Sequence, residues 1–177
     1  MIKNILKAFT VLALAGNVAF ADNNTATIDQ IGDDNYVFVK QEGNLNTSSA
    51  LQIGNNNQSL LDSPDGQSNL PDIPGQVQIG NSNTATLVQV GNSNFSGQYQ
   101  QGNFNVAEVI SLGSGNVAIQ VQSGEGNVTN LRQEGNLNKS IDFQFGNNNT
   151  INKNQTGNSN YSKVTQIGNG ATVTVNN

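Results

Sequence analysis

Polar and apolar residues alternate in short segments along this chain, and a glycine-containing group separates each segment from the next. Residues 83–89 show the pattern, with Asn83, Ala85, Leu87 and Gln89 at alternate positions. Side chains of a β-strand point alternately to opposite faces, so these four residues share one face. An apolar period of two residues predicts strands, because a helix would repeat every 3.6 residues.

The segments belong to an 11-residue repeat of the form Q-x-G-x-x-N. Each repeat predicts one strand followed by one tight turn. Glycine suits such a turn because it adopts positive φ without a steric penalty. The predicted turn glycines are Gly32, Gly43, Gly54, Gly80, Gly91, Gly102, Gly113, Gly124, Gly135, Gly146, Gly157 and Gly168.

Two strands and two turns return the chain to its starting wall, which predicts an all-β solenoid of 22-residue, two-strand coils. Counting one strand from the asparagine of each repeat gives 14 strands and about seven coils. Such coils stack with parallel, in-register strands about 4.8 Å apart, as in amyloid. One coil is irregular, because 26 residues separate Gln52 from Gln78. We interpret the insertion around residues 62–75 as a degenerate repeat at Gln67 with four extra residues and a strand from Asp72.

The face that repeats carries asparagine and glutamine, and we expect it to point inward. A buried amide without a partner costs about 1–3 kcal/mol. In stacked coils the same amide recurs at every level, so each side chain can donate to one neighbour and accept from another. The expected inward ladder residues are Asn24, Gln30, Asn35, Gln41, Asn46, Gln52, Asn57, Gln67, Gln78, Asn83, Gln89, Asn94, Gln100, Asn105, Asn116, Gln122, Asn127, Gln133, Asn138, Gln144, Asn149, Gln155, Asn160 and Gln166.

Two charged residues fall on the predicted inward face. Asp142 and Lys153 each lie two places before a ladder glutamine, at equivalent positions of consecutive strands. Burying either charge alone would be strongly unfavourable, so we expect a buried ion pair across one coil. The alternative is a local distortion of the register that lets both side chains reach water.

The composition narrows the possible functions. Hydrophobic residues are 34% and charged residues 11% of the chain, both below the usual share of a globular domain. Cysteine and histidine are absent, which removes thiolate chemistry and the commonest general base and metal ligand. We therefore expect no enzymatic activity, no metal and no cofactor. The net charge of −5 argues against nucleic acid as a required partner.

Residues 1–21 have the features of a secretory signal peptide. Lys3 and Lys7 precede a short apolar run, and residues 19–21 form a small-x-small cleavage pattern. The run is too short to span a membrane. We predict cleavage after Ala21 and a mature solenoid over residues 22–177 without a membrane span.

The two outer walls of the predicted solenoid differ in polarity. One wall carries apolar residues such as Val77, Tyr99 and Phe143. It is a candidate for lateral contacts between filaments, although the β-propensity of strand residues explains it equally well. Neither the strand from Asn24 nor the strand over residues 172–177 has a predicted cap. Both would then expose open edges, which are templates for another copy.

These units resemble curlin repeats, the units of bacterial curli subunits, whose pattern is Q-x-G-x-x-N-x-A-x-x-x-Q. In one repeat the pattern is matched by Gln78, Gly80, Asn83, Ala85 and Gln89. The resemblance covers about residues 24–177. It implies a secreted subunit of a functional amyloid fibre on a Gram-negative cell surface, with roles in biofilm matrix, adhesion and surface colonisation.

The same resemblance implies partners. They are further copies of the chain in a homopolymeric fibre, a nucleator curlin subunit and an outer-membrane curli export pore. Nucleator subunits tend to end in a basic repeat, whereas residues 172–177 are uncharged. The resemblance therefore favours the major subunit, with a nucleator-type subunit as the alternative.

Other functions stay open. A solenoid of this kind could act as a monomeric adhesin. A β-helical enzyme would need clustered carboxylates, and the only adjacent acid pair, Asp33 and Asp34, falls in a predicted turn. An ice-binding solenoid would need continuous Thr-x-Thr rows. We expect no continuous row, because the motif occurs on three predicted strands, at Thr25 and Thr27, Thr84 and Thr86, and Thr172 and Thr174.

Overall fold

The computed structural model describes residues 23–59 and 75–177, and this part of the chain consists of strands and turns without a helix. Sheet A contains β1 (Thr25–Ile31), β4 (Thr47–Ile53), β7 (Thr84–Val90), β9 (Val106–Leu112), β11 (Val128–Glu134), β13 (Thr150–Thr156) and β15 (Thr172–Asn176). Sheet B contains β2 (Tyr36–Val37), β3 (Val39–Glu42), β5 (Gln58–Ser59), β6 (Gln76–Ile79), β8 (Phe95–Gln101), β10 (Val117–Ser123), β12 (Lys139–Phe145) and β14 (Tyr161–Ile167).

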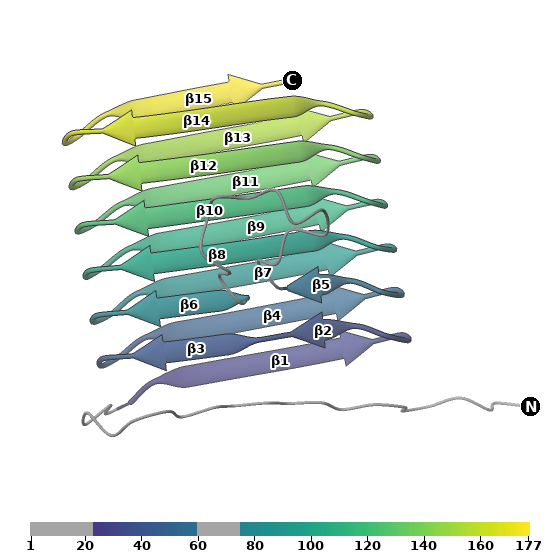
Figure 1. Ribbon diagram of the computed structural model, residues 1–177, viewed down its shortest axis with the longest axis horizontal. Helices are drawn as coiled ribbons and strands as arrows, with labels where there is room; N and C mark the ends of the chain where they lie inside the picture. The colour runs from purple at the N-terminus through teal and green to yellow at the C-terminus, as the bar shows by residue number, and fades with distance from the viewer. Residues whose placement is uncertain (1–22, 60–74) are drawn as a thin grey trace, which may run out of the picture.

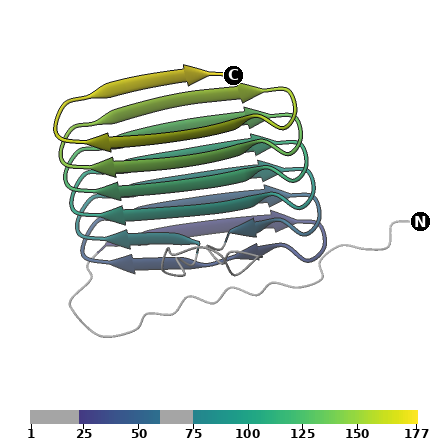
Figure 2. The ribbon, with the colours of Figure 1, turned by 45° about the horizontal axis from the view of Figure 1, so that its top comes forward.

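The chain climbs as a flattened coil, in which successive full-length strands alternate between the two sheets (Figure 1). We call each row of strand residues within one sheet a level. The turned view shows the sheets lying face to face with the turns along both margins (Figure 2). All strand pairings are parallel and in register, so that Gln100, Gln122 and Gln144 occupy successive levels of one column. The predicted all-β solenoid with 22-residue spacing is confirmed.

The number of levels differs from the prediction. Sheet A has seven levels and sheet B six, because β2 with β3, and β5 with β6, each share one level. Gln41 pairs with Gln78, 37 residues further on, which exceeds the usual separation of 22 by 15 residues. These pairings leave no separate level for the strand predicted from Asp72, so that interpretation is wrong. The insertion interrupts one strand between Ser59 and Gly75 instead, and Gln67 lies outside the described residues.

Hydrogen-bonding groups dominate the space between the sheets. In the described residues, 30 polar or charged residues are buried, against 11 apolar ones. The buried apolar residues are small or aliphatic, and six of them form an interior cluster that includes Leu87, Val109 and Leu131. Burial alternates along most strands, as in β9, where Ala107, Val109 and Ser111 are buried and their neighbours are not. Close packing of this narrow interior therefore depends on satisfying its amides.

The turns allow adjacent levels to approach closely at glycine. Gly113 has φ +123°, and a Cβ added to it would lie 2.0 Å from the carbonyl oxygen of Gly135 on the next level. Two positions after the glycine the backbone is again left-handed, with φ +58° at Phe104 and φ +59° at Leu137. Each turn therefore has two positive φ values. Only the first position also excludes a side chain on packing grounds.

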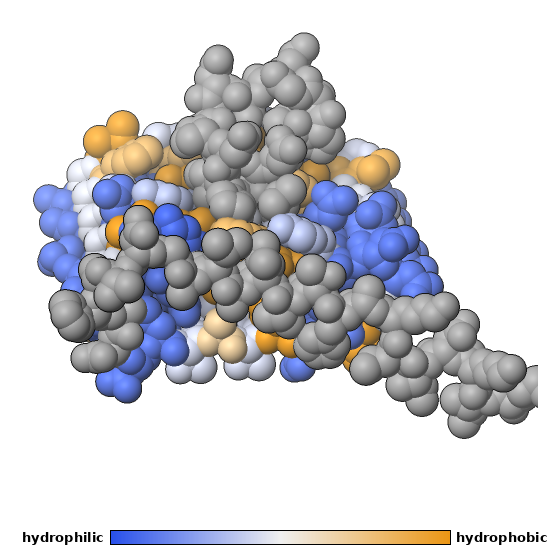
Figure 3. Space-filling model, turned by 60° about the horizontal axis from the view of Figure 1, so that its bottom comes forward, coloured by the Kyte–Doolittle hydropathy of each residue, from blue (hydrophilic) through white to orange (hydrophobic). Residues whose placement is uncertain are grey.

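The solenoid's margins are hydrophilic. In the space-filling view from below, blue residues gather at the two sides of the visible face, and more apolar residues lie between them (Figure 3). The margins correspond to the turns, which are rich in asparagine. Three large apolar side chains nevertheless project from the turns, at Leu45, Phe104 and Leu137, and are 56–65% exposed.

Candidate functional site

The predicted glutamines form two columns, one in each sheet; the sheet B column is unbroken, and Ser111 interrupts the sheet A column. In each column the Nε2 of one glutamine donates to the Oε1 of the glutamine on the next level, at 2.7–3.0 Å. The sheet B column runs through six levels: Gln41, Gln78, Gln100, Gln122, Gln144 and Gln166. The sheet A column contains Gln30, Gln52, Gln89, Ser111, Gln133 and Gln155.

Each glutamine amide also holds the two sheets together. The second Nε2 hydrogen of Gln122 donates to the carbonyl of Val106 on sheet A at 2.8 Å, and Gln100 donates likewise to Thr84 at 2.9 Å. One amide thus bonds along the stack and across it. A shift of either sheet by one residue would break both bonds, so the columns set the register.

The asparagines perform the same task at the turns. Asn105 donates from Nδ2 to the carbonyl of Gly124 on the level above, at 2.9 Å, and its backbone N–H donates to Oδ1 of Asn83 on the level below, at 3.0 Å. Equivalent bonds to the turn glycines, 2.7–2.9 Å long, occur from Asn24 to Asn149. The glycine carbonyl therefore accepts this bond at the place where a side chain could not fit.

Removing one glutamine from the middle of a column should be costly. Replacing Gln122 with methionine keeps the volume but leaves the Gln100 amide and the Val106 carbonyl each short of one partner. At about 1–3 kcal/mol for each of the two groups, we expect the free energy of unfolding to fall by about 2–6 kcal/mol in urea titrations of the dilute chain. Gln58→Met, at an exposed position of β5, is the control and should change little. Equal effects of the two changes would contradict the ladder.

Three further columns were missed from the sequence. Gln76, Gln98 and Gln120 lie inward on sheet B, where Gln76 Nε2 donates upward to Gln98 at 2.8 Å and Gln98 Nε2 donates upward to Gln120 at 3.1 Å. Buried serines occupy the position of the repeat's alanine in several strands, including Ser96 and Ser140. Asparagines of the turns also accept from the level below through Oδ1, as Asn136 does from Ser114 N–H at 2.9 Å. The 22-residue spacing of these residues was the available signal.

The structure brings Asp142 and Lys153 together inside the solenoid. Asp142 lies on β12 and Lys153 on the facing β13, with 2.5 Å between Oδ1 and Nζ, and both side chains are fully buried. Ser140 lies between them: Lys153 Nζ donates to its Oγ at 3.1 Å, and Oγ donates to Asp142 Oδ2 at 3.2 Å. Burial raises the pKa of the Asp142 carboxyl and lowers the pKa of Lys153, while their mutual attraction opposes both shifts. They are the only charged residues buried in the described part of the chain.

Both ends of the described solenoid are open. In a parallel strand, alternate residues direct N–H and C=O to opposite neighbours. Asn177 pairs downward with β13, so Thr172, Thr174 and Asn176 direct their backbone groups upward. In β1 the upward groups of Thr25 pair with β4, so the alternate residues direct theirs downward. Within residues 23–59 and 75–177, nothing pairs with the lower edge of β1 or the upper edges of β14 and β15.

Hydroxyl side chains form a short array on the outer face of sheet A. Because β1, β4 and β7 are adjacent, Thr25 and Thr27, Thr47 and Ser49, and Thr84 and Thr86 occupy three successive levels. Because β4 carries Ser49 at the second position, these levels form a short hydroxyl array and not a continuous Thr-x-Thr row. Valines interrupt the column above them, at Val106 and Val128.

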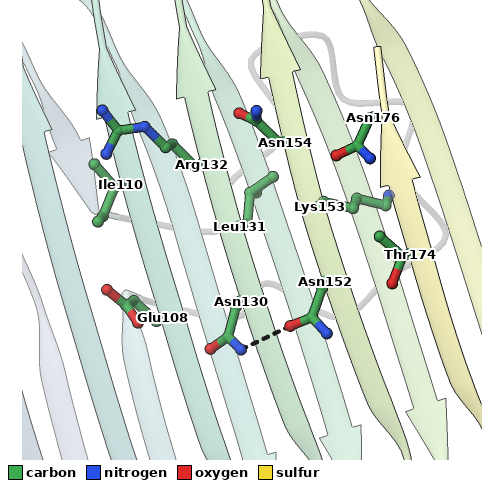
Figure 4. Close-up of a pocket in the computed structure, with 10 residues that line it drawn as sticks. All are labelled: Glu108, Ile110, Asn130, Leu131, Arg132, Asn152, Lys153, Asn154, Thr174 and Asn176. Carbon is green, nitrogen blue, oxygen red and sulfur yellow. Dashed lines mark hydrogen bonds between the residues drawn. The ribbon is translucent and has the colours of Figure 1, made fainter.

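The same face is hollowed at its upper half. A shallow groove of about 270 Å³ lies over β9, β11, β13 and β15, with amides, Glu108 and Arg132 along it (Figure 4). Asn130 Nδ2 donates to Asn152 Oδ1 there, at 2.9 Å. Arg132 is ion-paired to Glu134 on the same strand. Glu108 is the only carboxylate that lines the groove. The groove therefore lacks the second carboxyl group that paired acid–base catalysis needs.

The outer face of sheet B is more apolar. Val77 packs with Ile79, Tyr99, Ile119 and Val121, and Val77 is only 5% exposed although it points outward. Further up, the rings of Phe143 and Phe145 stack with their centroids 6.4 Å apart, and Lys163 lies over Phe143 at 5.7 Å. The predicted difference in polarity between the walls is thus present.

The described residues give little support for a carboxylate-based catalytic site, a metal site or a membrane-spanning helix. The acid pair Asp33 and Asp34 lies in the turn between β1 and β2, where Asp33 N–H donates to Asn55 Oδ1. The described residues contain no cluster of three side chains suited to hold a metal ion. None of their elements is a helix of membrane-spanning length and polarity.

The fold and its amide columns define a repeat protein of the β-solenoid class. The curlin associated repeat family matches residues 21–50 and 32–63, and the structure continues the same register to residue 177. Residues 21–63 are therefore similar to curlin associated repeats, which points to a structural repeat protein. No curated protein and no solved structure gives a significant match.

Proposed function

We propose that this protein is a self-assembling subunit of an extracellular curli-type amyloid fibre and that the fibre grows by stacking copies end to end. The open edges at both ends of the solenoid carry this proposal. At each edge a row of backbone groups lacks a partner in the described chain, and the inward amides stop in mid-column. Such edges act as templates for pairing with another chain.

Another copy of the chain fits these edges better than an unrelated strand would. The column from Gln41 to Gln166 leaves Gln41 Oε1 at its lower end. At its upper end Gln166 Nε2 donates to the carbonyls of Thr150 and Ala171 in the single solenoid, at 3.1 and 3.0 Å, and not to a further glutamine. An incoming coil must present glutamine, asparagine and glycine at the same spacings to continue all the columns. Inward residues at the ends are also less buried than those in the middle, as Ile28 and Val175 are compared with Leu87. Stacking would bury them.

The match to the curlin associated repeat also supports a proposal about secretion and the biological setting. We propose that residues 1–21 are removed as a signal peptide and that the solenoid of residues 22–177 leaves the cell through an outer-membrane curli pore. A nucleator curlin subunit would start the fibre, and the fibre would serve biofilm matrix, adhesion and surface colonisation. The repeat match supports this setting, and no feature of the solenoid favours one adhesive target.

Blocking the upper edges should stop growth without unfolding the subunit. Thr165 in β14 and Thr174 in β15 direct their N–H groups upward, where no described residue accepts them. Proline at both positions removes these donors and no internal hydrogen bond. For Thr165→Pro/Thr174→Pro we expect at least a tenfold loss of seeded growth, measured by thioflavin fluorescence, with an unchanged circular dichroism spectrum of the monomer.

The matched control is Thr165→Ala/Thr174→Ala, which keeps both N–H groups and should grow like the parent. Fibre diffraction of the parent should show the strand spacing of about 4.8 Å along the fibre axis. A parent protein that stays monomeric and thioflavin-negative for days would contradict the fibre and favour a monomeric adhesin.

A further inference from the structure

The two sheets of the solenoid contain unequal numbers of levels. Sheet A has seven and sheet B six, so the described coil contains an odd number of strand levels. β1 and β15 consequently lie in the same sheet (Figure 1). At the upper end β15 stands half a level above β14, and at the lower end β1 lies half a level below β2 and β3.

This parity decides how a second copy can continue the stack. A copy that is only translated places its β1 on β15, and its β2 and β3 then lie two levels above β14. A gap one strand wide would remain in sheet B. It would leave the upward backbone groups of Tyr161, Lys163 and Thr165 unpaired and would interrupt the column at Gln166. Unpaired groups of this kind are what sheet edges avoid.

We infer that successive copies are related by a half-turn about the stack axis, so that sheet A of one copy continues as sheet B of the next. The half-turn places β1 on β14 and β2 with β3 on β15, in parallel orientation and without a gap. This inference rests on the proposed end-to-end fibre and specifies the interface between two stacked copies, which we call the joint.

Side chains across the β1–β14 joint match in kind at every inward position. With the repeat in register, Asn24 meets Asn160, Ala26 meets Ser162, Ile28 meets Val164, and Gln30 meets Gln166. On the outer face Ile31 meets Ile167. These residues are 61% and 81% exposed in the single solenoid, and each would cover the other.

The second half of the joint is equally well matched. Val37 meets Val173, Val39 meets Val175, and Gln41 meets Asn177, again at inward positions. Asp29 also comes diagonally beside Lys163 of the copy below, which brings opposite charges together. In the translated arrangement Gln166, Val164 and Ser162 would face the gap instead.

The half-turn has a consequence for the fibre surface. Each side of the fibre would show the apolar face of sheet B and the polar face of sheet A in alternation. One copy contributes six and a half spacings of about 4.8 Å, so the faces would alternate about every 31 Å. Neither the hydroxyl array of sheet A nor the apolar cluster around Val77 on sheet B would therefore form a continuous stripe along the fibre.

Helical reconstruction of fibres of residues 22–177 by cryo-electron microscopy tests the joint directly. We expect a rise of about 31 Å and a rotation near 180° per subunit, apart from the twist of the coil itself. A rise of about 34 Å with a rotation near 0° would overturn the inference and leave the fibre intact. A protein that forms no fibre would overturn the proposed function and the joint together.

Cysteine pairs give a second readout, because the chain has no cysteine of its own. Ile31→Cys/Ile167→Cys places two thiols on adjacent strands only across the half-turn joint, at a Cα separation of about 4.8 Å that a disulfide can span. We expect oxidised fibres of this variant to give a ladder of covalent multimers in denaturing gels. Asp29→Cys/Asn176→Cys, adjacent only in the translated joint, should give none. The reverse pattern, or fibres in which neither pair crosslinks, would overturn the inference.

Discussion

Replacing Asp142 alone with asparagine should lower the free energy of unfolding by about 3–5 kcal/mol, because the change leaves Lys153 charged and buried without its partner. The two groups are 2.5 Å apart with both side chains fully buried, so no water can take over from the lost carboxylate. Ser140 Oγ remains as a neutral acceptor for Lys153, which is a weak substitute for a carboxylate. Urea titration of the dilute chain, followed by circular dichroism, measures the loss.

The control removes both charges. In Asp142→Val/Lys153→Leu each residue takes the identity of a neighbour in its own column, since Val164 follows Asp142 and Leu131 precedes Lys153. Apolar replacement of a buried pair is often neutral or stabilising by about 1–4 kcal/mol, so the double variant should recover the parent's stability. A single Asp142→Asn variant as stable as the parent would show that the pair is not buried and ionised.

Adding one methyl group at Gly113 should be nearly as damaging. The new Cβ would lie 2.0 Å from the carbonyl oxygen of Gly135, a distance at which the levels must separate. Separation would also disturb the bond from Asn116 Nδ2 to the same carbonyl, now 2.8 Å long. We expect Gly113→Ala to lose about 4 kcal/mol or more of unfolding free energy.

Gly168→Ala separates this collision from backbone strain. Gly168 has φ +120°, close to the +123° of Gly113, but a Cβ there would meet nothing within 4 Å. It should lose only the strain of an unfavourable φ, about 1–3 kcal/mol. The comparison must use the monomer, because a stacked copy would cover Gly168. Equal losses at both positions would mean that φ, and not the approach of levels, requires glycine.

These effects share one cause, which is that the interior accepts a single register. Asp142 and Lys153 face each other only when β12 and β13 are aligned as observed. The amide columns repeat at every level and would tolerate a slip of a whole coil, whereas this pair occurs once. Because one turn joins β12 to β13, the pair fixes the alignment of these two strands within their coil.

Much of the interior could be predicted because it depends on local order in the chain. The alternation at residues 83–89 placed Ala85 and Leu87 on one face, and equal offsets from Gln144 and Gln155 placed Asp142 opposite Lys153. The role of Gly113 followed similarly from its place in the repeat. Neighbouring residues determine such features, since strand geometry assigns every second side chain to the same face.

The level count could not be predicted in this way. The 26 residues between Gln52 and Gln78 fit either a short insertion plus a degenerate repeat, or one long insertion within a strand. The first interpretation placed Thr47 and Thr84 on opposite walls, whereas they are adjacent in sheet A. Longer loops cost little additional closure entropy, so chain length alone does not decide between the two.

The sequence by itself determined the repeat, the strands, the inward face, the turn glycines and the buried pair. Only the tertiary structure decided that Gln41 pairs with Gln78 and that the levels of the described coil are therefore odd in number. An even count would have allowed copies to stack by translation, whereas the odd count is the basis of the inferred half-turn. The repeat period can be recognised from residues close together in the chain. Whether the number of levels is odd or even depends on which distant strands pair, and those pairings form only in the folded coil.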